Sequence, residues 1–211
     1  MAPTGGWQVD VLGKPYYAET IELPGDDEGD VVATLVRRRG RSRSTRAVLH
    51  VHGFADYFFQ TPAADYWLSR GYDFYALDLR KYGRSLLPHQ TPNFTTDLAD
   101  YYPELDEAFR RLTERDGHDH VVMSGHSTGG LVVPLWLEDQ AVRVAGVVLN
   151  SPWLDLHGSL LLRTATDLLN CGHNLGRCSG NLLNGCRQLF SCRSKMVRAS
   201  VAFRRRLDLA G

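Results

Sequence analysis

Short runs of β-branched and aromatic residues recur along the first 150 residues, and turn-forming residues bound each of them. Residues 16–23 and 31–37 alternate apolar and polar positions, which predicts two half-exposed antiparallel strands joined by an acidic, Gly-rich turn. Four later runs are apolar throughout and predict parallel strands that are covered on both faces of a sheet. These runs are 47–53, 73–79, 120–125 and 144–150.

Segments with helical spacing separate the later strands. Residues 60–70 form an amphipathic pattern that ends at a glycine, and residues 98–115 carry apolar side chains at near-helical intervals after Thr96 or Asp97 as N-cap. A third segment, 128–139, contains Pro134, which is expected to kink it. This alternation predicts an α/β fold, with a doubly wound, mostly parallel sheet between helices on both faces.

The net charge of zero conceals two parts of opposite sign. Residues 1–162 hold 15 basic and 22 acidic side chains, whereas residues 163–211 hold nine basic and two acidic ones. The second part also contains all four cysteines. Such a change marks a boundary. We therefore expect a folded core over 1–162 and an atypical, basic, poorly ordered tail over 163–211.

Composition limits the cellular compartments and the binding partners that we expect for this protein. The chain is 43% apolar and 23% charged, with no apolar run long enough to span a membrane and no signal-peptide pattern at its start. We expect a cytoplasmic protein. The tail cysteines, spaced 7, 8 and 6 apart, lack the close pairs typical of zinc sites, and the basic run 204–206 is expected to be solvated. No metal, organic cofactor or nucleic-acid partner is expected.

The sharpest motif is Gly-His-Ser-Thr-Gly at residues 125–129, directly after one predicted strand and before a predicted helix. A Gly-x-Ser-x-Gly sequence in this setting is typical of a nucleophile elbow, a tight turn that exposes its serine above the sheet. The two glycines are needed because larger side chains would collide across the turn. The pattern makes Ser127 a candidate catalytic nucleophile. The alternative is a tight structural turn with an incidental serine.

Two further strand ends carry polar motifs. His52-Gly53-Phe54 follows the third strand, where such folds place one of the two backbone N–H donors of an oxyanion hole. His52 itself is interpreted as a hydrogen-bonded residue that shapes this loop. After the fourth strand, Asp78 and Arg80 are expected to pair and brace the loop, with Gly83 in its turn.

These three motifs, in this order, resemble the α/β-hydrolase superfamily, and most of all its serine aminopeptidase and monoglyceride-lipase-like branch. The resemblance covers about residues 10–160. It implies a serine hydrolase of esterase, lipase, lysophospholipase or aminopeptidase type, which acts on a small-molecule ester or amide through an acyl-enzyme. Ser127 matches the nucleophile, and the backbone N–H groups of Phe54 and Thr128 match the oxyanion donors.

The resemblance also implies an acid and a histidine after two further strands, and the sequence offers no clear equivalent. The downstream histidines are His157 and His173, and the acids are Asp155, Asp167 and Asp208. Because Asp155 and His157 are so close in sequence, and His173 lies in the tail, we expect neither pair to form a working triad. A frameshift or truncation near residue 163 would explain the tail and the loss of the last two strands.

Three functional alternatives stay open. The chain could be a serine hydrolase, an acyltransferase that uses the same elbow, or a catalytically inactive fragment or scaffold that lacks the triad acid and base. Loss of the last two strands would expose a sheet edge, so self-association through that edge is also expected.

Overall fold

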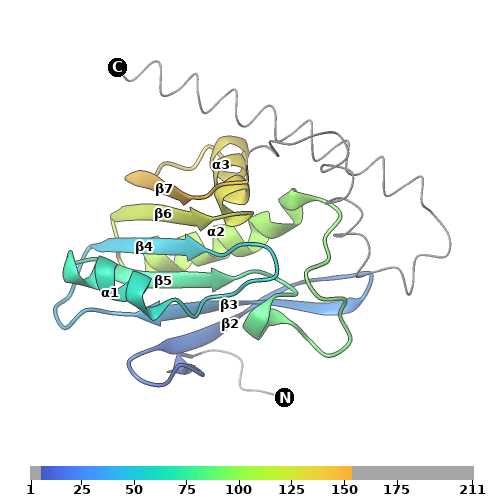
Figure 1. Cartoon of the computed structure of the whole chain (residues 1–211), viewed down its shortest axis with the longest axis horizontal. Helices are drawn as coiled ribbons and strands as arrows, with labels where there is room; N and C mark the ends of the chain where they lie inside the picture. Colours follow the sequence, from blue (N-terminus) through green and yellow to red (C-terminus); the bar gives the residue numbers. More distant parts are fainter. Residues whose placement is uncertain (1–5, 154–211) are drawn as a thin grey trace. The chain divides into compact units, whose positions relative to one another are not determined.

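The computed structural model describes residues 6–153, which form the sheet and helices of Figure 1. The predictions about the tail lie outside these residues. They concern the boundary near 163, the tail cysteines, the basic run 204–206, the two downstream histidines and the three downstream acids. In the described part, no helix is long and apolar enough to cross a membrane.

A seven-stranded sheet runs through the molecule in the order β1-β2-β3-β5-β4-β6-β7. The strands β1, β2, β3 and β5 pair antiparallel, whereas β5, β4, β6 and β7 are mutually parallel. Their bounds are Gln8–Val9 (β1), Tyr17–Asp26 (β2), Gly29–Arg38 (β3), Arg46–Val51 (β4), Asp73–Asp78 (β5), His120–His126 (β6) and Gly146–Asn150 (β7). All six strands predicted from the sequence are therefore confirmed, and the sheet is mostly parallel as expected.

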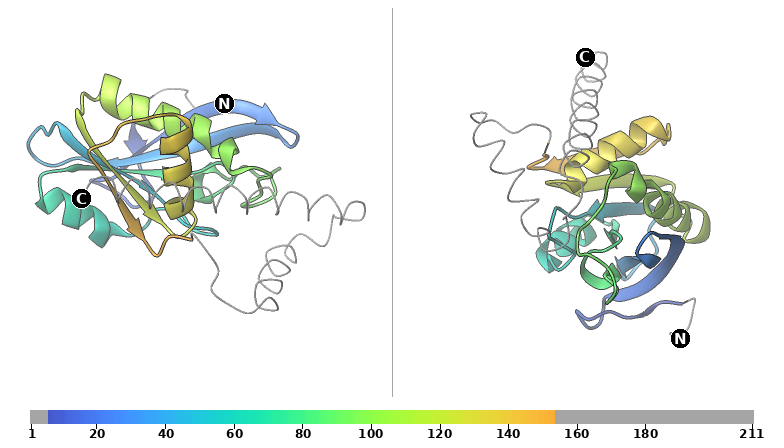
Figure 2. Two further views of the ribbon diagram at one scale, coloured as in Figure 1. Left: turned by 90° about the horizontal axis from the view of Figure 1, so that it is seen from above. Right: turned by 90° about the vertical axis from the view of Figure 1, so that its right-hand side faces the viewer.

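The helices lie on both faces of the sheet. Figure 2 shows α1 on one face and both α2 and α3 on the other. Asp97 is the N-cap of the long second segment, which begins as a short 3-10 turn, continues as α2 and ends in a π-helical turn. The bounds are Thr61–Ser69 (α1), Gly83–Ser85 (η1), Leu98–Tyr101 (η2), Tyr102–Arg110 (α2), Arg111–Arg115 (η3) and Gly129–Asp139 (α3).

Apolar side chains from both faces of the central strands form the core. On the α1 face, Phe58, Ala64 and Phe74 pack with Val48, and all four are essentially inaccessible. On the other face, the largest buried side chain is Trp136 of α3. Its indole N–H donates to Asp106 at 2.8 Å, so its burial leaves no unpaired donor. Burial on both faces holds the strand ends in fixed positions.

Two strands differ from the predicted burial. In β3 the residues from Ala33 to Val36 are all buried, so side chains on both faces of this inner strand are covered. The expected alternation is therefore found in β2 but not in β3. In β7 no residue is fully buried, and Val148 is 46% exposed, so the expectation of a strand covered on both faces is wrong there.

The sheet order also locates a switch point. The strand β4 lies between β5 and β6, and the chain leaves it toward β5 before returning on the other side to form β6. In Figure 1 these three strands point the same way, so their carboxyl ends meet at one edge. Open α/β sheets bind ligands at such an edge.

Candidate active site

Ser127 follows β6 in a left-handed backbone conformation, with a φ of 49°. L-residues other than Asn and Asp rarely adopt this region, and strain of this kind gathers at functional sites. Two hydrogen bonds hold the turn: the Ser127 N–H donates to the Asn150 carbonyl, and its carbonyl accepts from the Gly130 N–H, each at 3.0 Å. The sequence-predicted nucleophile elbow is therefore present as a backbone structure.

The glycines of the motif are required by close backbone contacts. A Cβ on Gly125 would lie 2.7 Å from the Gly129 carbonyl oxygen, and a Cβ on Gly129 would lie 2.4 Å from the carbonyl oxygens of both Val51 and His52. These separations are far below van der Waals contact. The second contact packs the start of α3 directly against the end of β4, which brings the two motif-bearing strand ends together.

Gly130 adds a contact that the motif alone does not predict. A Cβ at this position would lie 2.8 Å from the Pro152 side chain, so the start of α3 also packs against the segment that follows β7. Together with the bond from Ser127 to the Asn150 carbonyl, it ties the elbow to the end of β7, in addition to the end of β4.

The loop after β4 stands next to the elbow. A Cβ on Gly53 would lie 3.0 Å from the Cβ of Ser127, which is tighter than ordinary van der Waals contact, so glycine favours this close approach of the loop to the elbow. In the described part of the chain, the backbone N–H groups of Phe54 and Thr128 donate to no other group. Each is thus able to donate to a ligand oxygen. The hydroxyl of Thr128 is also buried and has no partner among residues 6–153.

His52 is fully used in supporting this loop. Its Nδ1 donates to the Gly53 carbonyl at 2.7 Å, and its Nε2 accepts from the Leu79 N–H at 3.0 Å. Its ring is 1% exposed, and burial lowers the pKa of His52 below the ordinary value, so the imidazole is neutral at pH 7. The interpretation of His52 as a loop-shaping residue is confirmed.

The loop after β5 is braced by a different pair from the one predicted. Asp78, which is inaccessible, accepts from the guanidinium of Arg84 at 2.8 Å and from the Phe58 N–H at 2.9 Å. Arg80 instead forms a two-pronged pair with the buried Glu104 of α2. The expected Asp78–Arg80 pair is therefore wrong. The strand ends at Asp78, and in the loop that follows Arg80 contacts Glu104 of α2, whereas Arg84 turns back to Asp78.

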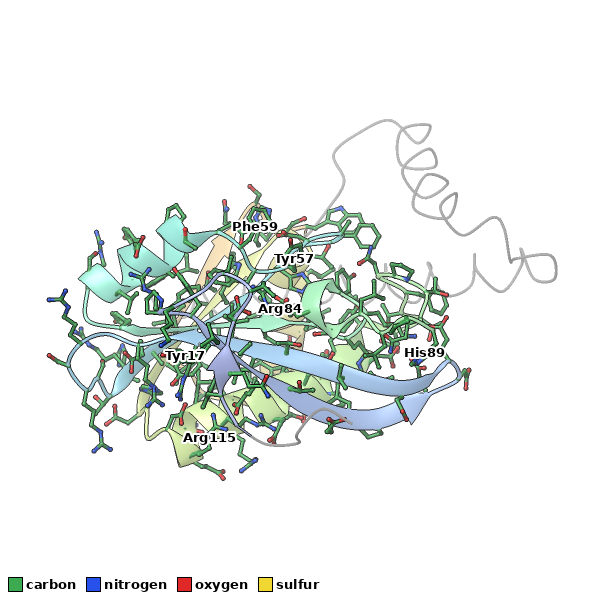
Figure 3. All side chains as sticks on the ribbon, turned by 90° about the horizontal axis from the view of Figure 1, so that it is seen from below. Tyr17, Tyr57, Phe59, Arg84, His89 and Arg115 are labelled. Atoms are coloured by element: carbon green, nitrogen blue, oxygen red, sulfur yellow. The ribbon has the colours of Figure 1, made fainter. Side chains whose placement is uncertain are left out.

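Arg84 joins three parts of the molecule. Its guanidinium also binds Asp10, at 2.6 and 2.8 Å, and the Phe58 carbonyl at 2.9 Å. Burial is the largest single influence and raises the pKa of Asp10, but the hydrogen bonds from Arg84 and from the backbone, together with the charge of Arg84, lower the pKa below the ordinary value. Figure 3 shows Arg84 next to Tyr57, whose ring centroid is 5.6 Å from the guanidinium carbon. Gly83, with a φ of 44°, makes the turn, as predicted.

We expect Asp78 and Arg84 to be energetically coupled. The variants Asp78→Asn and Arg84→Gln each remove one charge of the pair and leave the opposite charge of the other residue buried. The double variant is therefore expected to lose less stability than the sum of the losses in the two single variants. The expected coupling is about 1–3 kcal/mol in urea denaturation. The matched pair Asp78→Asn and Arg80→Gln is expected to be nearly additive. Equal coupling in both cycles would contradict the observed pairing.

No histidine in residues 6–153 hydrogen-bonds to Ser127. His50 of β4 faces Ser124 at 3.2 Å, and His126 contacts the Asn150 carbonyl at 3.2 Å. Burial, followed by the neighbouring His52, lowers the pKa of His50 to about 4. The remaining histidines of this part lie away from the elbow, at positions 89, 118 and 120. The two downstream histidines, His157 and His173, lie outside the described residues.

A family model for serine aminopeptidase, S33, matches residues 42–195, which is well over half of the chain. The chain belongs to this family. The match contains the loop after β4, the loop after β5 and the elbow, and it continues past the change in charge at residue 163. No curated protein matches the chain.

Solved structures share the fold of this serine aminopeptidase family member. A monoglyceride lipase from Saccharomyces cerevisiae matches with a TM-score of 0.55 and 21% identity, over 80% of this chain and 53% of that one. An α/β hydrolase from Penicillium sp. matches with a TM-score of 0.56 and 18% identity, over 75% and 54%. A carboxyl esterase from Bacillus coagulans matches with a TM-score of 0.54 and 15% identity, over 75% of this chain and 50% of that one. The chain spans about half the length of these proteins, and the α/β-hydrolase fold class is confirmed.

The fold brings together most of what the sequence singled out. Ser127, Gly53 and the start of α3 meet at the carboxyl ends of β4 and β6. Three features were missed: the Asn150 carbonyl, Arg84 and the close approach of Gly130 to Pro152. The Asn150 and Pro152 contacts, and the pair between Arg84 and Asp10, join segments far apart in sequence, and no local pattern indicates them. In the described part, no group of three or more histidine, cysteine or acidic side chains is arranged to hold a metal ion.

Proposed function

We propose that this chain hydrolyses carboxylic esters or amides of small molecules through an acyl-enzyme formed on Ser127. The observation that carries the proposal is the strained φ of 49° at Ser127, in a turn that begins a helix and packs against the loop after β4. Family membership and the hydrolase neighbours support the reaction class. A serine held this way presents its hydroxyl to a bound carbonyl group with little further rearrangement.

Each part of the reaction falls to a particular group. Ser127 Oγ attacks the carbonyl carbon while a general base takes its proton, and the oxygen becomes an oxyanion. The Phe54 and Thr128 N–H groups donate to that oxygen, which contributes a few kcal/mol each to lowering the barrier. Collapse breaks the bond to the alcohol or amine, which takes the proton from the base as it leaves, and the acyl group stays on Ser127. Water, activated by the same base, then releases the acid.

The side chains around the loop after β4 favour an apolar acyl group. Phe54, Tyr57 and Phe59 are 45, 41 and 52% exposed, and the rings of Tyr57 and Phe59 lie 5.5 Å apart. Figure 3 shows these last two side by side. Aromatic side chains of this kind bind hydrocarbon better than charged groups.

The test is a pre-steady-state assay with p-nitrophenyl butyrate. The expected result is a burst of about one equivalent of p-nitrophenol followed by steady turnover, as an acyl-enzyme requires. The variants His157→Ala and His173→Ala locate the base, because the one that supplies it loses the burst. Release no faster than in buffer would overturn the proposal and identify the chain as a scaffold without a working base.

A further inference from the structure

A cavity of about 420 Å³ lies at the end of the sheet opposite the elbow, where β4 and β5 begin. The loop between β3 and β4 forms one wall of it, and the segment between η3 and β6 forms the other. Four arginines line it: Arg39, Arg41, Arg43 and Arg115. The proposed hydrolytic reaction uses none of them.

The acidic side chains of this cavity are already paired. Asp116 accepts from Arg39 and from the Tyr75 hydroxyl, at 2.8 and 2.7 Å, and Arg115 lies 3.2 Å from it. Asp73 accepts the backbone N–H of Gly40 at 2.8 Å, which fixes the loop. These contacts compensate both carboxylates and hold the wall in place.

Two positive charges are left over. Arg41 and Arg43 form no ion pair within residues 6–153, although both line the cavity. The nearest atom to a Cβ built on Gly117 is a guanidinium nitrogen of Arg43, at 3.7 Å, so this side chain extends across to the opposite wall. The cavity therefore carries uncompensated guanidinium groups beside neutralised carboxylates.

A buried imidazole, that of His118, also lines the cavity. His118 is 3% exposed, and its Nε2 contacts the Tyr75 hydroxyl at 3.0 Å. Its Nδ1 is buried, and the backbone of Ser44 lies next to the ring. The imidazole is therefore part of the fixed wall of the cavity.

We propose that this cavity binds the phosphate group of a small phosphorylated molecule. Guanidinium groups match phosphate oxygens in geometry and charge, and paired charge-assisted bonds of this kind are strong. The cavity is larger than one phosphate ion, which is why a phosphate attached to a further group is the expected ligand. The site is separate from the elbow and does not depend on the proposed hydrolysis.

The test is calorimetric titration of the full chain with inorganic phosphate, pyrophosphate and glycerol 3-phosphate at matched ionic strength. We expect saturable binding, tighter for the last two than for inorganic phosphate. The double variant Arg41→Gln, Arg43→Gln is expected to weaken it at least about tenfold. The control Arg143→Gln removes another exposed arginine that does not line the cavity, and it is expected to change affinity by less than about twofold.

Three results would overturn the proposal. The first is that none of the three probes binds at concentrations up to about 10 mM. The second is that the control variant weakens binding as much as the double variant does. The third is that single-stranded RNA binds and outcompetes pyrophosphate. The melting temperature of each variant without ligand checks folding. Because both arginines are exposed and unpaired in the described residues, it is expected to stay within about 2 °C of the parent.

Discussion

Replacement of Ser127 by alanine is expected to reduce the hydrolysis of p-nitrophenyl butyrate by at least about a thousandfold, to the level of the buffer reaction. The variant keeps the turn, because alanine tolerates the backbone of the elbow as well as serine does, but it has no oxygen to form the acyl-enzyme. The Phe54 and Thr128 N–H groups stay in place, so any residual rate above buffer measures what they contribute. Steady-state kinetics of the two proteins give the comparison.

Ser124→Ala is the matched control. Ser124 lies on the same strand, three residues before Ser127, and its hydroxyl faces the Nδ1 of His50 at 3.2 Å. It thus forms the serine–histidine contact that Ser127 lacks within residues 6–153. We expect this variant to retain at least about half of the activity. Loss of activity in Ser124→Ala with full activity in Ser127→Ala would make Ser124 the nucleophile and contradict our account.

The second large effect is expected at Gly129. In Gly129→Ala, the added methyl group would lie 2.4 Å from two carbonyl oxygens, those of Val51 and His52. Neither oxygen belongs to a flexible side chain, so the start of α3 must move away from the end of β4. We expect a loss of at least about 3 kcal/mol in the free energy of unfolding, measured by urea denaturation.

Gly146→Ala controls for the general cost of replacing glycine. Gly146 begins β7, its φ lies outside the left-handed region, and a Cβ there would meet nothing within 4 Å. This variant is expected to lie within about 0.5 kcal/mol of the parent, or slightly above it. Similar losses in the two variants would mean that the packing of α3 against β4 is not what Gly129 provides.

The strands and the elbow could be predicted because their signals are local. Apolar runs such as 73–79 reflect burial on both faces, and Gly-x-Ser-x-Gly reflects contacts within a five-residue turn. The burial of individual strands was harder to predict. The strand β3 has an alternating sequence but is buried on both faces from Ala33 to Val36, since the elements that cover each face are set by the whole topology. Burial of this kind is not encoded in one strand alone.

The pairing around the site was predicted least well. Asp78 and Arg80 are close in sequence and opposite in charge, yet each binds a different partner, because Arg84 turns back through η1 and α2 brings Glu104 to Arg80. The contact between Ser127 and Asn150 depends in the same way on β7 lying beside β6. Interactions fixed by tertiary structure need the fold before they can be assigned.

The central claim is that Ser127 is an activated nucleophile, and covalent trapping tests it most directly. The chain is incubated with a fluorophosphonate ester and its intact mass and peptides are measured, with Ser127→Ala in parallel. Our account predicts one phosphonyl group per chain, on the peptide that contains Ser127, and none on the alanine variant. An unmodified chain, or equal labelling of both proteins at another residue, would contradict it.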